Sequence, residues 1–161
     1  MSVARETVRG TRYSGVRDHL AILHRRYLDL ILTGRKTVES RLSVVRPRMF
    51  GLVRPGDRIW LKQAGGPIRA VATALHVEQW SGLAPADLQA LRRAHGRSIA
   101  APPDYWKRHA HARYAVLIWL HDVRTPLHTP AINRPRGSRH AWHILAPSAR
   151  AATRTPPQTA P

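Results

Sequence analysis

The segment from Gly34 to Arg41 concentrates side chains that can bind an anion or move a proton. It reads Gly-Arg-Lys-Thr-Val-Glu-Ser-Arg. Lys36 and Arg41 can contact phosphate or a base edge, and Glu39 can orient them, accept a hydrogen bond from an exocyclic amine or act as a general base. If the segment is extended, alternation places Thr37, Glu39 and Arg41 on one face. The alternative is a solvated strand edge, where a pair between Glu39 and Arg41 contributes little to stability.

Aromatic side chains among arginines are typical of sites that stack unpaired bases. Trp60 and Trp119 fall in predicted strands, which favours core positions for both. Tyr105 and Trp106 fall in a predicted loop or helical turn, so we expect these two to stack a base. The candidate nucleic-acid-binding residues are Arg35, Lys36, Thr37, Glu39, Arg41, Arg46, Arg48, Lys62, Tyr105 and Trp106. The candidate catalytic residues are Lys36 and Glu39.

The sequence has ten histidines and no cysteine. His109 and His111 would share one face of an extended segment, and His140 and His143 could add ligands. No carboxylate cluster accompanies them and H-E-x-x-H is absent, so neither a metal nor another cofactor is predicted. A histidine could still relay a proton in phosphodiester cleavage. Walker A, G-x-S-x-G and G-x-G-x-x-G motifs are also absent, which leaves nucleotide hydrolase, serine hydrolase and dinucleotide functions unsupported.

The charge predicts a polyanionic partner. Lysine and arginine number 27 against 9 acids, a formal net charge of +18. Most of this charge falls between Asp18 and Ala146, so it belongs to the predicted folded part. Neutralising phosphates drives non-specific nucleic-acid affinity, and RNA or another single-stranded nucleic acid is the expected partner. No apolar run is long enough to span a bilayer and no secretory signal is present, so we expect a cytoplasmic monomer without membrane contact.

The order of apolar and polar segments predicts one folded domain, residues 18–146, between a disordered basic arm, 1–17, and a disordered tail, 147–161. Gly34 is placed to end the first helix, and Asp104 to cap the last one. This pattern is typical of a small, mostly β, α+β barrel with two or three flanking helices. The predicted strands are Asp18–His24, Lys36–Leu42, Asp57–Lys62, Ile68–Val77, Tyr114–Leu120 and His140–Leu145. The predicted helices are Arg25–Leu32, Pro85–His95 and the single turn Asp104–His109.

Three segments together resemble the ASCH domain family of PUA-like β-barrels. The first is the end of the helix with the G-x-K-x-x-E-x-R signature, Leu32–Arg41. The second is Arg-Pro-Gly-Asp-Arg-Ile at 54–59, and the third is Ala-Val-Ala-Thr-Ala at 70–74. The resemblance implies a PUA-like barrel that recognises RNA or a nucleotide in a cleft beside it, with Lys36 facing the cleft. It also implies that Tyr105 or Trp106 could line an aromatic cage for a modified base.

The resemblance leaves binding and catalysis open. A binding module would contact phosphates through Lys36, Arg41, Arg46 and Arg48. A metal-independent ribonuclease would use Lys36, with Glu39 as general base. Some family members resemble amidohydrolases that remove an acyl group from a modified cytidine, using the signature lysine, a threonine three residues later and a later glutamate. Position 39 is glutamate here, so we rank deacylation of a modified nucleoside last. A scaffold for acidic proteins is the remaining alternative.

Overall fold

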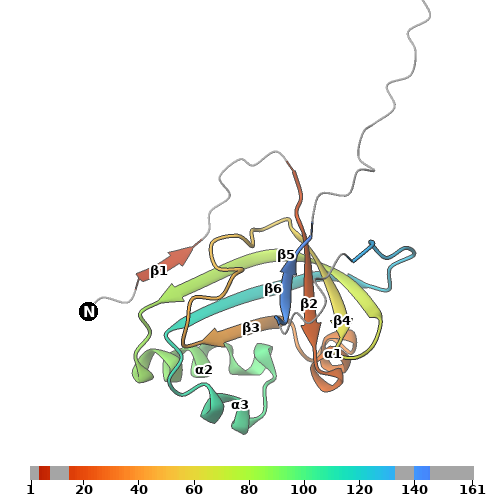
Figure 1. Cartoon of the computed structure of the whole chain (residues 1–161). Helices are drawn as coiled ribbons and strands as arrows, with labels where there is room; N and C mark the ends of the chain where they lie inside the picture. Colours follow the sequence, from red (N-terminus) through yellow and green to blue (C-terminus); the bar gives the residue numbers. More distant parts are fainter. Residues whose placement is uncertain (1–3, 8–14, 133–139, 146–161) are drawn as a thin grey trace, which may run out of the picture.

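The computed structural model describes residues 4–7, 15–132 and 140–145, and within them the chain forms seven strands and three helices (Figure 1). The strands are β1 (Ala4–Thr7), β2 (Asp18–Leu23), β3 (Val38–Ser43), β4 (Arg58–Gln63), β5 (Ile68–Ser81), β6 (Tyr114–Arg124) and β7 (Trp142–Ile144). The helices are α1 (Arg25–Leu32), α2 (Pro85–Ile99) and α3 (Pro103–Arg108). None of these helices has the length and apolar character needed to cross a bilayer.

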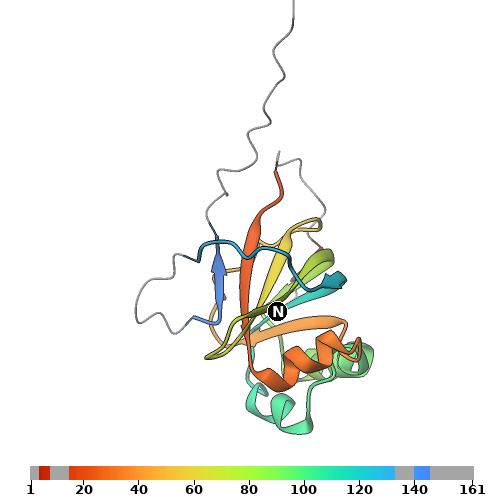
Figure 2. The same cartoon turned by 90° about the vertical axis from the view of Figure 1, so that its right-hand side faces the viewer.

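The described strands form one mixed sheet in the order β3-β6-β5-β4-β2-β7, with β1 paired to β5. Only β2 and β4 run parallel; the other neighbours are antiparallel. The pairing of β5 with β6 shifts register between Ala74 and His76, and such bulges increase the local twist. The sheet therefore curls into a half-barrel, with all three helices at one end of it (Figures 1 and 2).

Two apolar clusters connect the helices to the sheet. The larger one packs α1 and the loop after β3 against the strands, and it includes Leu28, Met49 and Ile118. The second packs α2 against β3 and β6, and includes Leu88 and Val38. Burying side chains of this size stabilises a fold by about 1.5–3 kcal/mol each. The helices are therefore fixed relative to β3, the strand that contains the second half of the sequence signature.

The sequence predicts the fold class and nearly all of these elements. The α+β class with flanking helices is confirmed, and α1 has the predicted bounds. The barrel is open, because β3 and β7 stand at the two ends of the strand order. Three elements run longer than predicted: β5 continues to Ser81, α2 to Ile99 and β6 to Arg124. The β5 extension pairs with β1 and β6, and the α2 extension ends at the buried Ile99, so tertiary contacts set where these two elements end.

Two local predictions need correction. Asp104 does not cap α3, because the helix begins one residue earlier at Pro103 and the capping position is Pro102. Proline suits the first helical position, where its missing N–H removes no hydrogen bond. The predicted disordered arm, 1–17, contains β1, which pairs with β5 from Glu78 to Ser81. The remaining division into arm, domain and tail stays a prediction, and the tail 147–161 lies outside the described residues.

Candidate functional site

The end of α1 and the end of α2 together determine where Lys36 lies. Gly34 adopts a left-handed backbone, φ 72°, which lets the chain reverse after the helix. The backbone N–H of Lys36 then donates to the Leu30 carbonyl at 2.9 Å. One residue later, the N–H of Thr37 donates to the Ser98 carbonyl in α2 at 3.0 Å. This reversal brings Lys36 between the two helices immediately before β3 begins.

The amino group of Lys36 is buried and has acceptors for all three of its N–H bonds. Nζ donates to the carbonyls of Val38 at 2.8 Å and Ile99 at 2.9 Å, and lies 3.3 Å from Oε2 of Glu39. Only 3% of the Lys36 side chain is exposed. Burial lowers the pKa of Lys36, although the Glu39 carboxylate opposes this shift.

Glu39 lies between two cations. Its Oε1 lies 2.9 Å from Nε of Arg41, in an ion pair whose N–H is not aligned as a hydrogen bond. Its side chain is 4% exposed, whereas that of Arg41 is 20% exposed. Nη2 of Arg41 donates to the Ile22 carbonyl in β2 at 3.2 Å. The alternative of a solvated strand edge is therefore wrong: Lys36 and Glu39 are buried, and of the three side chains only that of Arg41 is partly exposed.

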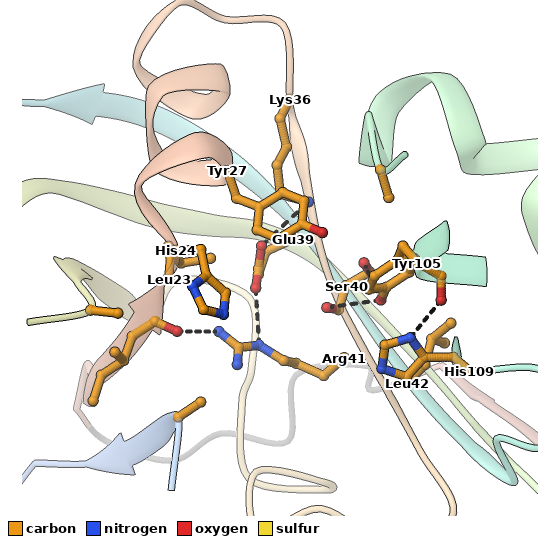
Figure 3. A pocket seen from close by; sticks show the side chains of 14 residues that line it. Leu23, His24, Tyr27, Lys36, Glu39, Ser40, Arg41, Leu42, Tyr105 and His109 are labelled. Carbon is orange, nitrogen blue, oxygen red and sulfur yellow. Dashed lines mark hydrogen bonds and ion pairs between the residues drawn. The ribbon is translucent and has the colours of Figure 1, made fainter. Parts of the chain in front are cut away.

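This cluster lines a cavity of about 350 Å³ between α1, α3, β3 and the β2–β7 edge (Figure 3). Arg41 reaches across the cavity from β3 toward β2, and the Tyr27 ring stands over Lys36 and Glu39 (Figure 3). The distance from Nζ of Lys36 to the Tyr27 ring centroid is 5.8 Å. The lining residues are Ile22, Leu23, His24, Tyr27, Lys36, Glu39, Ser40, Arg41, Leu42, Ala64, Ala101, Tyr105, His109 and Ala141.

A second polar group lies across the cavity from α1, where α3 meets β3. The hydroxyls of Ser40 and Tyr105 are 2.8 Å apart. Burial raises the pKa of Tyr105, so this phenol stays neutral and can donate a hydrogen bond. Nδ1 of His109 lies 2.7 Å from the Tyr105 carbonyl. Because a carbonyl only accepts, Nδ1 carries the proton, and Nε2 of the neutral ring is an acceptor.

No protein-family model and no curated protein matches this chain. Among solved structures, the chain is similar to the ASCH protein of Zymomonas mobilis and to variants of it. The tyrosine-to-phenylalanine variant aligns with a TM-score of 0.52 at 19% identity, covering 65% of this chain and 69% of that chain. The unsubstituted protein aligns with a TM-score of 0.50 at 19% identity, covering 65% and 67%.

This chain has the ASCH fold. The likeness spans about two thirds of both chains, and it confirms the resemblance that the sequence signature predicts. At this level of identity it establishes how the chain folds, and the chemistry of the cavity has to be derived from this chain's own residues.

The ASCH fold brings four of the ten predicted binding residues into the cavity: Lys36, Glu39, Arg41 and Tyr105. The other six do not line it. Arg35 and Thr37 are exposed positions within the signature, and Arg46 and Arg48 are exposed in the loop after β3. Lys62 donates to the carbonyls of Gln63 and Gly66 at the hairpin turn. Trp106 packs edge-on against Tyr105 and lies 6.0 Å from the Arg92 guanidinium.

Four polar lining residues were missed at the sequence level: His24, Tyr27, Ser40 and His109. Tyr27 lies in the predicted helix Arg25–Leu32 without a signal of its own, and the spacing of His109 and His111 points only to a possible pair of metal ligands. Their common role depends on α1 and α3 standing on opposite sides of β3, which no local pattern reports. Within the described residues, no three histidine or acidic side chains are close enough together to hold a metal ion.

Proposed function

We propose that this ASCH-fold module binds one nucleotide unit of RNA, or of another single strand, in the cavity beside the half-barrel. The observation that carries this proposal is the Arg41 guanidinium. Among the described residues, its Nη1 has no hydrogen-bond partner, while Nη2 and Nε are held by Ile22 and Glu39. A half-buried guanidinium that keeps free donors while its other nitrogens contact the protein is suited to a phosphate or to the acceptor edge of a base.

The surroundings of Arg41 favour a nucleotide over other acceptor ligands. Tyr27 and His24 supply ring faces on the α1 side, and Tyr105 and His109 supply polar atoms on the α3 side. Aromatic faces stack unpaired bases, while the polar atoms can read base edges. A volume of about 350 Å³ is at the small end of ligand pockets, which suits one nucleotide unit rather than a duplex.

The contacts of Lys36 favour binding over catalysis at this site. Its three N–H bonds are directed at Val38, Ile99 and Glu39, all within the protein. A lysine that acts as nucleophile or base needs a free lone pair that is aimed at the substrate. Lys36 therefore fits a structural role, in which it holds the Glu39 carboxylate and so positions Arg41.

Replacing Arg41 by glutamine tests the proposal. We expect Arg41→Gln to weaken binding of a mixed-sequence, single-stranded RNA by about tenfold or more, because a charge-assisted hydrogen bond contributes about 1.5–3 kcal/mol. Fluorescence anisotropy of a labelled RNA without added metal measures the affinity, and a thermal melt checks that the variant is folded.

Arg93→Gln is the matched control, because Arg93 is an exposed arginine on α2 away from the cavity. It removes the same charge and should change affinity only slightly. Equal losses in the two variants would mean that the protein binds RNA by net charge alone. The same samples are run on a denaturing gel. Cleavage by the wild type that disappears in Arg41→Gln would replace the binding proposal with a metal-independent ribonuclease.

A further inference from the structure

Ala141, in the wall of the cavity, immediately precedes β7, a three-residue strand far from the signature in sequence. β7 pairs with β2 through Ala21 and His19, and the Ala141 carbonyl accepts a hydrogen bond from Ile22 N–H at 2.9 Å. Trp142 is the buried residue of β7, with 6% of its surface exposed. The same peptide segment that contributes Ala141 to the cavity wall therefore anchors itself in the core through Trp142.

The orientation of the Trp142 indole is determined by a buried hydrogen-bonded chain. Its Nε1–H donates to Nδ1 of His19 at 3.2 Å, and Nε2 of His19 lies 3.0 Å from Oδ2 of Asp57. Since Nδ1 accepts, the His19 proton is on Nε2 and is donated to the carboxylate. Asp57 also accepts the backbone N–H of Arg17 at 3.1 Å and of Arg54 at 2.9 Å. The plane of the indole is thus fixed from β2 and from the turn before β4.

The face of that indole lies against the Arg41 guanidinium. The guanidinium carbon is 5.3 Å from the ring centroid of Trp142, within the range of a cation–π contact. The polar contacts of Arg41 alone hold it loosely, because its hydrogen bond to the Ile22 carbonyl is long and its Nε is not aligned on Glu39. The indole supplies the remaining constraint on the plane of the guanidinium.

We propose that Trp142 is a positioning residue of the cavity: oriented by His19 and Asp57, its ring holds the Arg41 guanidinium against Glu39 with Nη1 free for ligand. The expected effect of Trp142 on RNA affinity rests on the proposed function. Its expected effect on the position of Arg41 rests on geometry alone. It assigns a functional role to β7, to which the sequence signature gives no clue.

Two substitutions of Trp142 separate the ring face from the indole N–H. Trp142→Phe keeps a ring beside Arg41 but loses the donor to His19, and we expect it to retain RNA affinity within about threefold. Trp142→Leu removes the ring, and we expect about tenfold weaker binding. In an Arg41→Gln background, Trp142→Leu should cause no further loss, because its effect acts through Arg41.

Trp60→Leu is the matched control for lost core volume. Trp60 is also buried, donates its Nε1–H to the Asp18 carboxylate at 3.0 Å and lies 5.9 Å from the guanidinium of Arg58, an arginine that does not line the cavity. The Trp60→Leu variant should lower the stability of the protein as Trp142→Leu does, but it should leave RNA affinity unchanged. Affinity that falls equally in the two variants would overturn the proposal, as would a folded Trp142→Phe that binds as poorly as Trp142→Leu.

Proton NMR of the ligand-free protein tests the positioning independently of RNA. The ring current of Trp142 should shift the Arg41 side-chain protons upfield in the wild type. The shift should persist in Trp142→Phe and disappear in Trp142→Leu. Unshifted Arg41 protons in the wild type would refute the inference even if RNA binds. Shifted protons in a wild type that does not bind RNA would instead refute the proposed function and leave the positioning intact.

Discussion

At the scale of single residues, the site is a buried cluster of two cations and one carboxylate. Lys36 and Arg41 lie on either side of Glu39, so the cluster carries a net positive charge close to the cavity. Burying charges is unfavourable unless each one is paired and hydrogen-bonded. Lys36 and Glu39 meet this condition within the protein, whereas Arg41 meets it only in part. A ligand that accepts hydrogen bonds from the free N–H groups of Arg41 therefore contributes most to satisfying the buried charges.

Replacing Lys36 by methionine should lower the free energy of unfolding. We expect Lys36→Met to cost about 3 kcal/mol, at the lower end of the range for breaking a buried ion pair, because Glu39 keeps Arg41 as a partner. Denaturant unfolding at neutral pH measures the change. Lys107→Met, at an exposed position on α3, is the control and should change stability little.

Lys36 also gives the stability a defined pH dependence. Because its folded-state pKa lies below 10.5, the unfolded chain binds more protons between the two values. The contribution of Lys36 therefore becomes more favourable as pH rises from its folded pKa toward 10.5. The difference in unfolding free energy between wild type and Lys36→Met should grow over that interval. A difference that shrinks would mean that burial does not disfavour the ammonium form.

At the scale of elements, the C-terminal ends of α1 and α2 bracket the signature. Each helix ends at a left-handed residue: Gly34 after α1 and Ala100 after α2, with φ 50°. The Ile99 carbonyl, next to Ala100, accepts from Lys36. The reversal after α2 therefore helps to place an acceptor for the buried lysine, with an alanine in a conformation that suits glycine.

Ala100→Gly should stabilise the protein. A non-glycine residue in the left-handed region costs about 1–2 kcal/mol, and part of this is offset because glycine loses more backbone entropy on folding. We expect a net gain of about 0.5–1 kcal/mol in the free energy of unfolding, measured by denaturant titration. Ala94→Gly, at an exposed position in α2, should lose about 1 kcal/mol. A loss in both variants would show that the end of α2 is not strained.

At the scale of the whole molecule, the formal net charge of +18 attracts any polyanion before the cavity contacts it. Exposed cations such as Arg46 and Arg48 lie outside the cavity. They suit the phosphates that flank a bound nucleotide, while the cavity distinguishes one unit from its neighbours. Measurements of RNA affinity at different salt concentrations should therefore separate the contribution of the net charge from that of the cavity.

RNA affinity should fall steeply with salt. Contact with about four phosphates of a single strand gives a slope of about −3 in a plot of log affinity against log salt concentration. Arg41→Gln should lower affinity at every salt concentration, whereas Arg93→Gln should converge with the wild type at high salt. Anisotropy titrations across a salt series measure both effects. Binding that does not respond to salt would contradict a phosphate contribution altogether.

Local sequence patterns are enough to predict most of the elements and the fold class. Helical spacing defined α1, a glycine marked its end, and alternation placed β3 and β4, because these features follow from periodicity and backbone preference over a few residues. The signature also identified Lys36, Glu39 and Arg41 as the chemical centre. The predicted roles of Arg35, Thr37 and Lys62 rested on residue type alone, and the cavity does not include them.

The roles of those residues follow from contacts between elements that are far apart in the chain. Whether all three N–H bonds of the Lys36 amino group have acceptors depends on the Ile99 carbonyl, which lies 63 residues away in the sequence, at the end of α2. Whether Arg41 is mobile or held depends on Trp142, a residue of the last described strand. The cavity lining combines His24, Tyr27 and His109 because α1 and α3 stand on opposite sides of β3. Such contacts are set by how elements pack against a curled sheet, and a local pattern carries no information about distances between elements far apart in the chain.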